Sequence, residues 1–135
     1  MPTPKQRYLR DLSREGFVAD PAQATAVDAL EDLYQRLVAK HSQPSAGLLG
    51  GLLKKFAKSE LQPEEGLYFW GGVGRGKTYL MDNFYESLPF ERKMRVHFHR
   101  FMRRVHQDLK QLRGQADPLR KVADKIASET CIICF

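Results

Sequence analysis

The sequence predicts an α/β fold in which a partial parallel sheet is flanked by helices and preceded by further helices at the N-terminus. Two patterns support this prediction: short apolar runs alternate with longer segments at helical spacing, and a glycine-rich stretch lies between one such run and a helix. Strands separated by helices are joined by crossover connections, which favour parallel pairing. With 135 residues, 42% of them hydrophobic and 28% charged, the chain has the composition of one globular domain or part of a larger one.

The N-terminal part contains two predicted helices. Tyr8, Leu9 and Leu12 indicate a short first helix. The second begins at Asp20-Pro21, because Asp is a favoured N-cap and Pro fits the first helical position, and it continues to about Lys40. Its apolar stripe consists of Val27, Leu30, Tyr34, Leu37 and Val38.

A segment rich in Ser, Pro and Gly follows between His41 and Glu65 and is interpreted as a linker. Inside it, a basic amphipathic stretch combines four apolar residues on one helical face with three lysines: Leu49, Leu52, Leu53, Phe56, Lys54, Lys55 and Lys58. Two interpretations stay open. The stretch packs on its own domain, which short helices usually need in water, or it docks on a partner or an anionic membrane surface.

The glycine-rich stretch has the spacing G-x-x-x-x-G-K-T of a phosphate-binding loop, the P-loop. The residues are Gly71, Gly72, Val73, Gly74, Arg75, Gly76, Lys77 and Thr78. Glycines let backbone N–H groups turn toward a phosphate, Lys77 can reach the β- and γ-phosphates, and the Thr78 hydroxyl is suited to bind Mg²⁺. The motif should follow a strand and open a helix, and we predict a strand over Gly66–Trp70 and a helix from Lys77 that stops at Pro89.

The C-terminal part is predicted to contain two strands with two helices between them. Arg95–Arg100 alternates as a strand, with His97 and His99 on one face, and Cys131–Phe135 is an apolar strand. The helix that follows the first of these strands ends at Gly114, and the next begins at Asp117-Pro118. The apolar stripes of the two helices are Phe101, Met102, Val105, Leu109 and Leu112, and then Leu119, Val122, Ala123 and Ile126.

The cysteines and histidines are interpreted as structural. Cys131 and Cys134 have the spacing of a redox or zinc motif, but residues three apart on a strand point to opposite faces, about 10 Å apart, so we expect buried, inert thiols. We expect no metal site at His97, His99 and His106. We expect a structural or nucleotide-sensing role for the strand histidines.

The net charge is +6, and the basic residues are spread along the chain rather than gathered in a block. We interpret them as a solvated surface and do not expect nucleic-acid binding from charge alone. No run of apolar residues is long enough for a membrane helix, and the N-terminus lacks the features of a secretory or transit peptide, so a cytoplasmic location is expected.

Three stretches resemble the ZapE-type ATPases, which are bacterial cell-division proteins of the AAA+ group of P-loop NTPases. They are the run from Gly66 to Thr78, the distinctive run Arg95–His106, and the terminal Cys131–Phe135, which looks like the Walker B strand. The resemblance begins at about Tyr8 and is weakest in the linker. It implies an AAA+-like P-loop fold, with residues 1–65 as N-terminal helices and linker and residues 66–135 as the first half of the ATPase domain.

The resemblance also implies ATP and Mg²⁺ as cofactors, with Gly71 through Thr78 around the phosphates, Lys77 as the catalytic residue and Thr78 at the metal. The Asp-Glu pair that follows the Walker B strand in this family is expected just beyond Phe135. The chain is therefore interpreted as an N-terminal fragment of a longer ATPase that does not hydrolyse ATP by itself.

The function implied by the resemblance is remodelling of a protein partner in cell division, the partner being the tubulin-like division-ring protein. Homo-oligomerisation of the full-length protein and contact with a membrane surface are left open. The alternative is a nucleic-acid-associated P-loop ATPase of the helicase-loader kind, in which the arginines between Arg95 and Arg113 would face phosphates. Salt dependence of DNA binding would separate the two.

Overall fold

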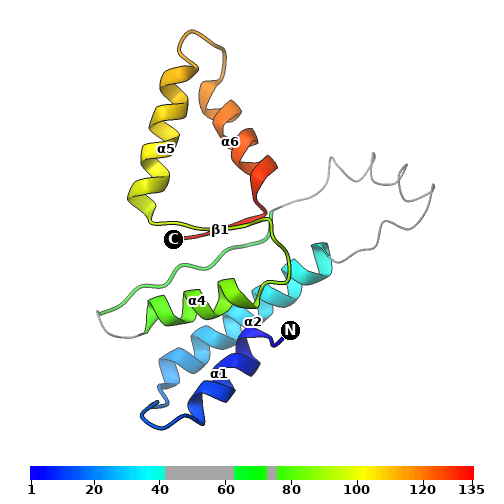
Figure 1. Ribbon diagram of the computed structural model, residues 1–135, viewed down its shortest axis with the longest axis vertical. Helices are drawn as coiled ribbons and strands as arrows, with labels where there is room; N and C mark the ends of the chain where they lie inside the picture. The colour runs from blue at the N-terminus through cyan, green and yellow to red at the C-terminus, as the bar shows by residue number, and fades with distance from the viewer. Residues whose placement is uncertain (42–62, 73–75) are drawn as a thin grey trace, which may run out of the picture. The chain divides into compact units, whose positions relative to one another are not determined.

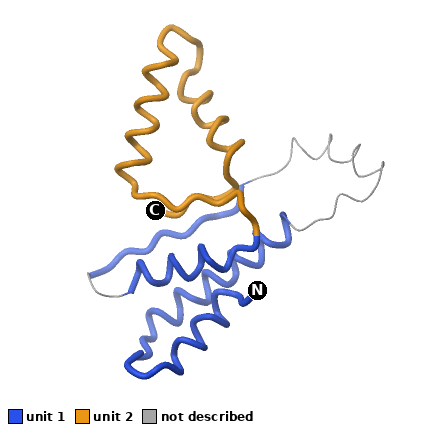
Figure 2. Tube along the Cα trace, in the orientation of Figure 1, with its two compact units in different colours: residues 1–89 blue, residues 90–135 orange. Residues whose placement is uncertain are grey.

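The computed structural model describes residues 1–41, 63–72 and 76–135. Its elements follow the order α1 (Pro4–Leu12), α2 (Pro21–His41), α4 (Lys77–Ser87), β1 (Lys93–Arg95), α5 (Phe98–Gln111), α6 (Pro118–Glu129) and β2 (Ile132–Cys134) (Figure 1). The chain divides into two compact units, Met1–Pro89 (unit 1) and Phe90–Phe135 (unit 2) (Figure 2). The amphipathic stretch predicted at residues 49–58 lies outside the described residues.

The two predicted N-terminal helices are confirmed, and both have well-formed starts. At α1, Gln6 N–H donates to Thr3 Oγ1 (3.3 Å) while Gln6 Oε1 accepts from Thr3 N–H (3.0 Å), so two backbone donors at the helix start are satisfied reciprocally. At α2, Asp20 Oδ1 accepts from Ala22 N–H at 2.8 Å, which confirms the predicted cap. The buried face of α2 consists of Val27, Leu30, Leu33, Tyr34 and Leu37.

The core of unit 1 forms where α4 packs against α1 and α2. Phe84, on α4, is only 2% exposed, and Leu80 and Leu88 are equally deep. The helix ends at Ser87, two residues before Pro89, which matches the predicted stop. The helix that carries the end of the glycine-rich motif is therefore held firmly on its apolar side.

The predicted strand over Gly66–Trp70 is wrong: these residues are extended but belong to no sheet. A strand requires a neighbouring strand for its backbone hydrogen bonds. In the described ranges, β1 and β2 pair only with each other, and residues 66–70 pair with neither. Tyr68 and Trp70 are 85% and 84% exposed as a result.

Unit 2 confirms the predicted parallel pairing on a small scale. β1 and β2 run parallel, with Met94 opposite Ile133, and α5 and α6 form the crossover between them (Figure 1). The helices meet in an apolar core of Val105, Val122 and Ile126, against which Phe101, Leu109, Leu112 and Ile133 pack.

The predicted strand Arg95–Arg100 is shifted and shortened in the structure. The strand is Lys93–Arg95, and α5 already begins at Phe98. Phe98 and Phe101 each make an edge-to-face contact with Phe135, at ring-centroid distances of 5.5 and 5.1 Å. Residues three apart share a face in a helix but not in a strand, so both rings can reach Phe135 only if this segment is helical. These contacts therefore favour the helix over the strand that the alternating pattern predicted. The histidines consequently do not share a strand face.

The C-terminal strand is found where it was predicted, within narrower bounds, and neither Cys131 nor Cys134 forms a disulfide. Cys134 is buried, as expected, whereas Cys131 is only half-buried. Asp117 precedes α6 as predicted, but its side chain makes no capping hydrogen bond, and its backbone is left-handed with φ of +48°.

Candidate nucleotide-binding site

The two ends of the glycine-rich loop are joined by one side chain. Lys77 Nζ donates to the carbonyl oxygens of Gly71 (2.8 Å) and Gly72 (2.7 Å). An ammonium group has three donors, so one N–H remains available for a further acceptor. The lysine is half-buried and stands at the first position of α4.

Gly76 is favoured where it stands chiefly by its backbone, and secondly by a neighbouring side chain that would have to move aside. Its φ of +76° is left-handed, which other residues adopt only with strain. In addition, a Cβ at this position would collide with the side-chain amide of Gln23 on α2. The loop therefore enters α4 through a turn that packs closely against another helix.

The N-terminus of α4 has no side-chain cap among the described residues. Gly76 provides no side-chain cap, and the first backbone bond of the helix is Leu80 N–H to Gly76 O at 3.0 Å. The N–H groups of the first turn have no intrahelical partners and carry the positive end of the helix dipole, which suits an anion. Thr78, the second residue of α4, is exposed.

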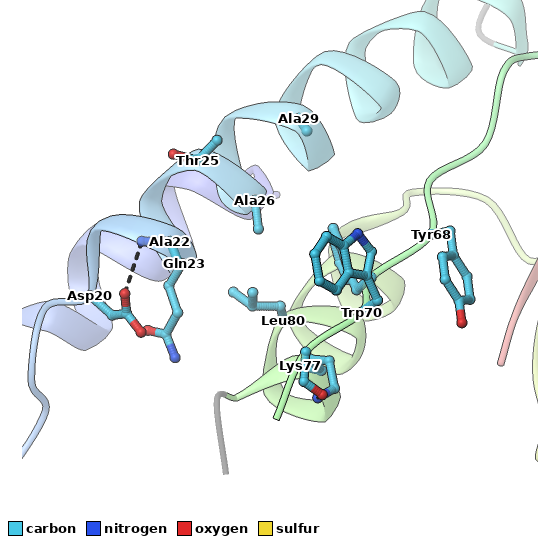
Figure 3. Close-up of a pocket in the computed structure, with 12 residues that line it drawn as sticks. Asp20, Ala22, Gln23, Thr25, Ala26, Ala29, Tyr68, Trp70, Lys77 and Leu80 are labelled. Atoms are coloured by element: carbon cyan, nitrogen blue, oxygen red, sulfur yellow. Dashed lines mark hydrogen bonds between the residues drawn. The ribbon is translucent and has the colours of Figure 1, made fainter. Parts of the chain in front are cut away.

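Beside Lys77 lies a pocket of about 470 Å³, within the size range of small-molecule sites (Figure 3). Its walls come from the first half of α2, the extended segment before the loop and the start of α4. The lining residues are Asp20, Ala22, Gln23, Thr25, Ala26, Ala29, Tyr68, Phe69, Trp70, Gly71, Lys77 and Leu80. The lining therefore combines a cation, Lys77, and a carboxylate, Asp20, with mostly apolar residues.

Polar contacts from α1 hold the opposite side of α4. Tyr79 OH donates to Asp11 Oδ2 at 2.6 Å. Burial, and then this hydrogen bond to the carboxylate, raise the pKa of the Tyr79 phenol, which therefore stays protonated. One and two helical turns further on, Asn83 Nδ2 donates to Pro4 O (3.2 Å) and Glu86 pairs with Arg7 (2.8 Å).

The structure brings Gly71, Gly72, Gly76, Lys77 and Thr78 of the predicted site together. Val73, Gly74 and Arg75 lie outside the described residues, so their predicted role stays a prediction. Sequence reasoning missed the contribution of α2, which it assigned to a segment leading into the domain. The available signal was the small residues Ala22, Ala26 and Ala29, which recur at helical spacing and leave room beside the helix.

The histidines lie away from this site in the sequence and belong to unit 2. His97 precedes α5, and its ring stacks on that of His99 at a centroid distance of 5.8 Å. In the part of the chain that the structure describes, no group of three side chains is arranged to hold a metal ion. Within the same residues, no helix is long and apolar enough to cross a membrane.

Comparison with known proteins decides the family. A profile of the AFG1-like ATPases matches residues 2–135. The chain belongs to the AFG1-like ATPase family. The chain is 48% identical to cell division protein ZapE of Escherichia coli K12, over 98% of its own length and 37% of that protein.

Two eukaryotic relatives extend the family. An uncharacterized protein of Schizosaccharomyces pombe is 34% identical over 98% of the chain and 36% of that protein. Lactation elevated protein 1 homolog B of Danio rerio is 43% identical over 57% of the chain and 18% of that protein. The chain thus spans little more than a third of the length of the relatives that it matches from end to end. No solved structure gives a significant match.

Proposed function

We propose that this chain carries the ATP-binding site of an AFG1-like ATPase. The observation that carries the proposal is the position of the Lys77 ammonium, at the open N-terminus of α4 and at the rim of the pocket of Figure 3. A cation, free helix N–H groups and glycines at both ends of the loop are what a triphosphate needs. Membership of an ATPase family supports the choice of ATP.

The pocket would receive the nucleoside. Ala26, Ala29 and Leu80 offer an apolar floor, and the exposed ring of Trp70 offers a face for stacking. Lys77 would bind the β- and γ-phosphates through its remaining N–H and by exchanging its carbonyl partners. The Thr78 hydroxyl, exposed on the first turn of α4, would bind Mg²⁺, which neutralises phosphate charge during transfer.

Residues 1–135 alone would not hydrolyse ATP at a measurable rate. Hydrolysis needs a carboxylate to hold Mg²⁺ and a group that orients the attacking water. In the described part of the chain, the only carboxylate lining the pocket is that of Asp20, which caps α2. Mg²⁺-dependent turnover by a preparation whose mass corresponds to residues 1–135 would contradict this.

For the whole protein, we propose ATP hydrolysis coupled to remodelling of a protein partner in cell division, in the cytoplasm. The name of the Escherichia coli relative supports the cell-division role. The tubulin-like division-ring protein is the partner that the family resemblance implies. Co-sedimentation of the whole protein with that partner, with and without ATP, tests this part. If the amount of co-sedimented protein is the same with and without ATP, remodelling driven by ATP is contradicted.

Substitution of Lys77 tests the nucleotide site. In the full-length protein, Lys77→Ala should weaken binding of a fluorescent ATP analogue by tenfold or more. The variant loses a charge-assisted contact to phosphate, which contributes on the order of 1.5–3 kcal/mol. The matched control is Lys121→Ala, which removes an exposed lysine of α6 and should change nothing. Unchanged ATP affinity in the Lys77 variant would refute the proposed site.

A further inference from the structure

The excess positive charge of the chain belongs entirely to unit 2. Residues 1–89 contain 11 Lys and Arg and 11 Asp and Glu, so their net charge is zero. Residues 90–135 contain 11 Lys and Arg but only 5 Asp and Glu, which gives +6, the charge of the whole chain. The basic residues are spread along the sequence, but the excess of positive over negative charge is confined to about a third of it.

Within unit 2, one side of α5 gathers three cationic side chains and two histidines. We call it the α5 basic face and define it as His99, Arg100, Arg103, His106 and Lys110, all of them exposed. At 3.6 residues per turn, the five positions fall within about 120° of the helix circumference. Val105 and Leu109, which pack into the core, lie on the other side of the helix. Gln107 and Gln111 are the neighbours of the basic face, and no acidic residue lies on it.

The acidic residues near α5 are engaged elsewhere. Arg104, which is not on the basic face, pairs with Glu129 at 2.6 Å and approaches Asp108 at 3.8 Å. Lys125 of α6 adds a contact of 3.9 Å to the same aspartate. By contrast, the side chains of the α5 basic face make no ion pair with any residue that the structure describes. Their charge is directed outward and is not neutralised locally.

We propose that the α5 basic face binds the phosphate backbone of nucleic acid. Charge complementarity requires an anionic partner, which could be a membrane surface, an acidic protein or nucleic acid. The side chains of the face distinguish these three. A membrane surface would need several exposed apolar side chains among the cations, but the basic face contains none, and of the apolar side chains of α5 only Phe98 is exposed. A protein interface would need apolar or aromatic anchors, and this face has none. Cationic and amide side chains without apolar anchors suit a phosphate backbone, which requires charge and hydrogen-bond donors.

The spacing of the face fits this partner. From position 99 to position 110 a helix rises about 16 Å, and one strand of nucleic acid presents roughly five phosphates over that length. Arg100, Arg103 and Lys110 can each neutralise one phosphate, and arginine is well shaped for phosphate oxygens. Because no element of the face is placed to read bases, the binding is independent of sequence.

The test measures binding of the chain to a labelled 20-nucleotide DNA, single-stranded and duplex, by fluorescence anisotropy over a series of salt concentrations. About three phosphate contacts predict that log K falls with log [salt] with a slope of roughly −2 to −3. In the double variant Arg103→Gln/Lys110→Gln, the slope should become less steep by about 2. Binding at 0.1 M salt should weaken on the order of tenfold or more.

The matched control is Arg120→Gln/Lys121→Gln. It removes one arginine and one lysine from exposed positions of α6, so the change in net charge is identical. If this control weakens DNA binding as much as the α5 variant does, the effect is one of net charge and the proposal fails. Circular dichroism of both variants should match that of the unaltered chain, since all four side chains are exposed.

Two further arms separate the partners. Binding to poly-glutamate, or to vesicles containing anionic lipid, with an affinity equal to that for DNA would overturn the proposal, as would no salt-dependent DNA binding at all. Tighter binding to DNA than to poly-glutamate or to anionic vesicles, lost in the α5 variant but kept in the α6 control, supports the proposal. ATP affinity, which depends on residues of unit 1, should be the same in all of these variants, so the outcome is independent of the proposed nucleotide site.

Discussion

The two units use charge in opposite ways. In unit 1, positive and negative side chains are equal in number, and several pairs join one element to another, as Arg7 and Glu86 do between α1 and α4. In unit 2, Arg104 and Glu129 likewise join α5 to α6, but positive side chains exceed negative ones, and those of the α5 basic face are exposed. Balanced charge that is paired between elements positions a binding loop, whereas unbalanced charge on one helix face is available for a partner.

The largest effect is expected from a substitution in the apolar core of unit 1, where α4 packs against α1 and α2. Phe84→Ala, on α4, should lower the free energy of unfolding by about 3–5 kcal/mol, because a large side chain that is only 2% exposed leaves a cavity. ATP affinity should fall as well, since α4 carries Lys77 and Thr78. Thermal unfolding followed by circular dichroism measures the first effect and analogue binding the second.

The control for this substitution is Leu9→Ala on α1, which truncates a side chain that is 56% exposed. It should change stability by less than about 0.5 kcal/mol. Equal destabilisation by the two substitutions would show that α4 is not packed as the structure describes.

A smaller effect is expected from the polar contact that follows the binding lysine. Tyr79→Phe removes the donor to Asp11 and should cost about 1–2 kcal/mol, because the carboxylate loses a close partner. ATP affinity should decrease by a few-fold through looser positioning of the first turn of α4. In a double-mutant cycle, Asp11→Asn should lower the free energy of unfolding by less in the Tyr79→Phe background than in the unaltered chain. Strictly additive losses would show that the two side chains do not interact.

The same contact predicts a pH effect with a definite sign. The pKa of Tyr79 is higher in the folded protein than in the unfolded chain, because burial and the Asp11 hydrogen bond favour the protonated phenol. The folded state therefore retains a proton that the unfolded state loses above about pH 10, and this part of the stability decreases as the pH rises further. Chemical denaturation between pH 9 and 11 should show a shallower decline for Tyr79→Phe. An identical decline would contradict the assigned cause.

The smallest effect is expected where two partly exposed charges pair, the side chains of Arg36 and Glu64 being 34% and 27% exposed. Hydrogen bonds from Arg36 lower the pKa of Glu64, with a smaller contribution from Lys40. Glu64→Gln should reduce the melting temperature only slightly at neutral pH, as solvent screens the pair. The difference should vanish as the pH falls through the lowered pKa of Glu64. Glu65→Gln, the same change one residue along, is the control; a larger effect there would show that the Arg36 contact is not responsible.

Local signals predicted the helices of both units well. Asp20-Pro21 placed the start of α2, and the spacing of Val122 and Ile126 placed the buried side of α6. These features succeed because capping and periodicity depend on neighbours in the sequence. Of the candidate site, the loop and the role of α4 were predicted, while the structure added the pocket wall formed by α2.

The strands were predicted less well, for a physical reason that two segments illustrate. Gly66–Trp70 and Cys131–Phe135 are both short apolar runs, but only the second lies beside a partner, β1, in the described residues. Strand formation depends on pairing with residues far away in sequence, which a run of apolar side chains does not reveal. The start of α5 at Phe98 was likewise missed because the aromatic contacts with Phe135 are distant in sequence.

The close approach of Gly76 to Gln23 has a consequence for how this protein can vary. A side chain at position 76 meets two separate obstacles, a left-handed backbone and the amide of Gln23. Shortening Gln23 to Ala would remove the second obstacle but leave the first, on the order of 1–2 kcal/mol of backbone strain. The contact with Gly76 therefore does not fix the residue at position 23 while glycine stays at 76, whereas a change at 76 can never be fully rescued from α2. The dependence between the two positions runs in one direction.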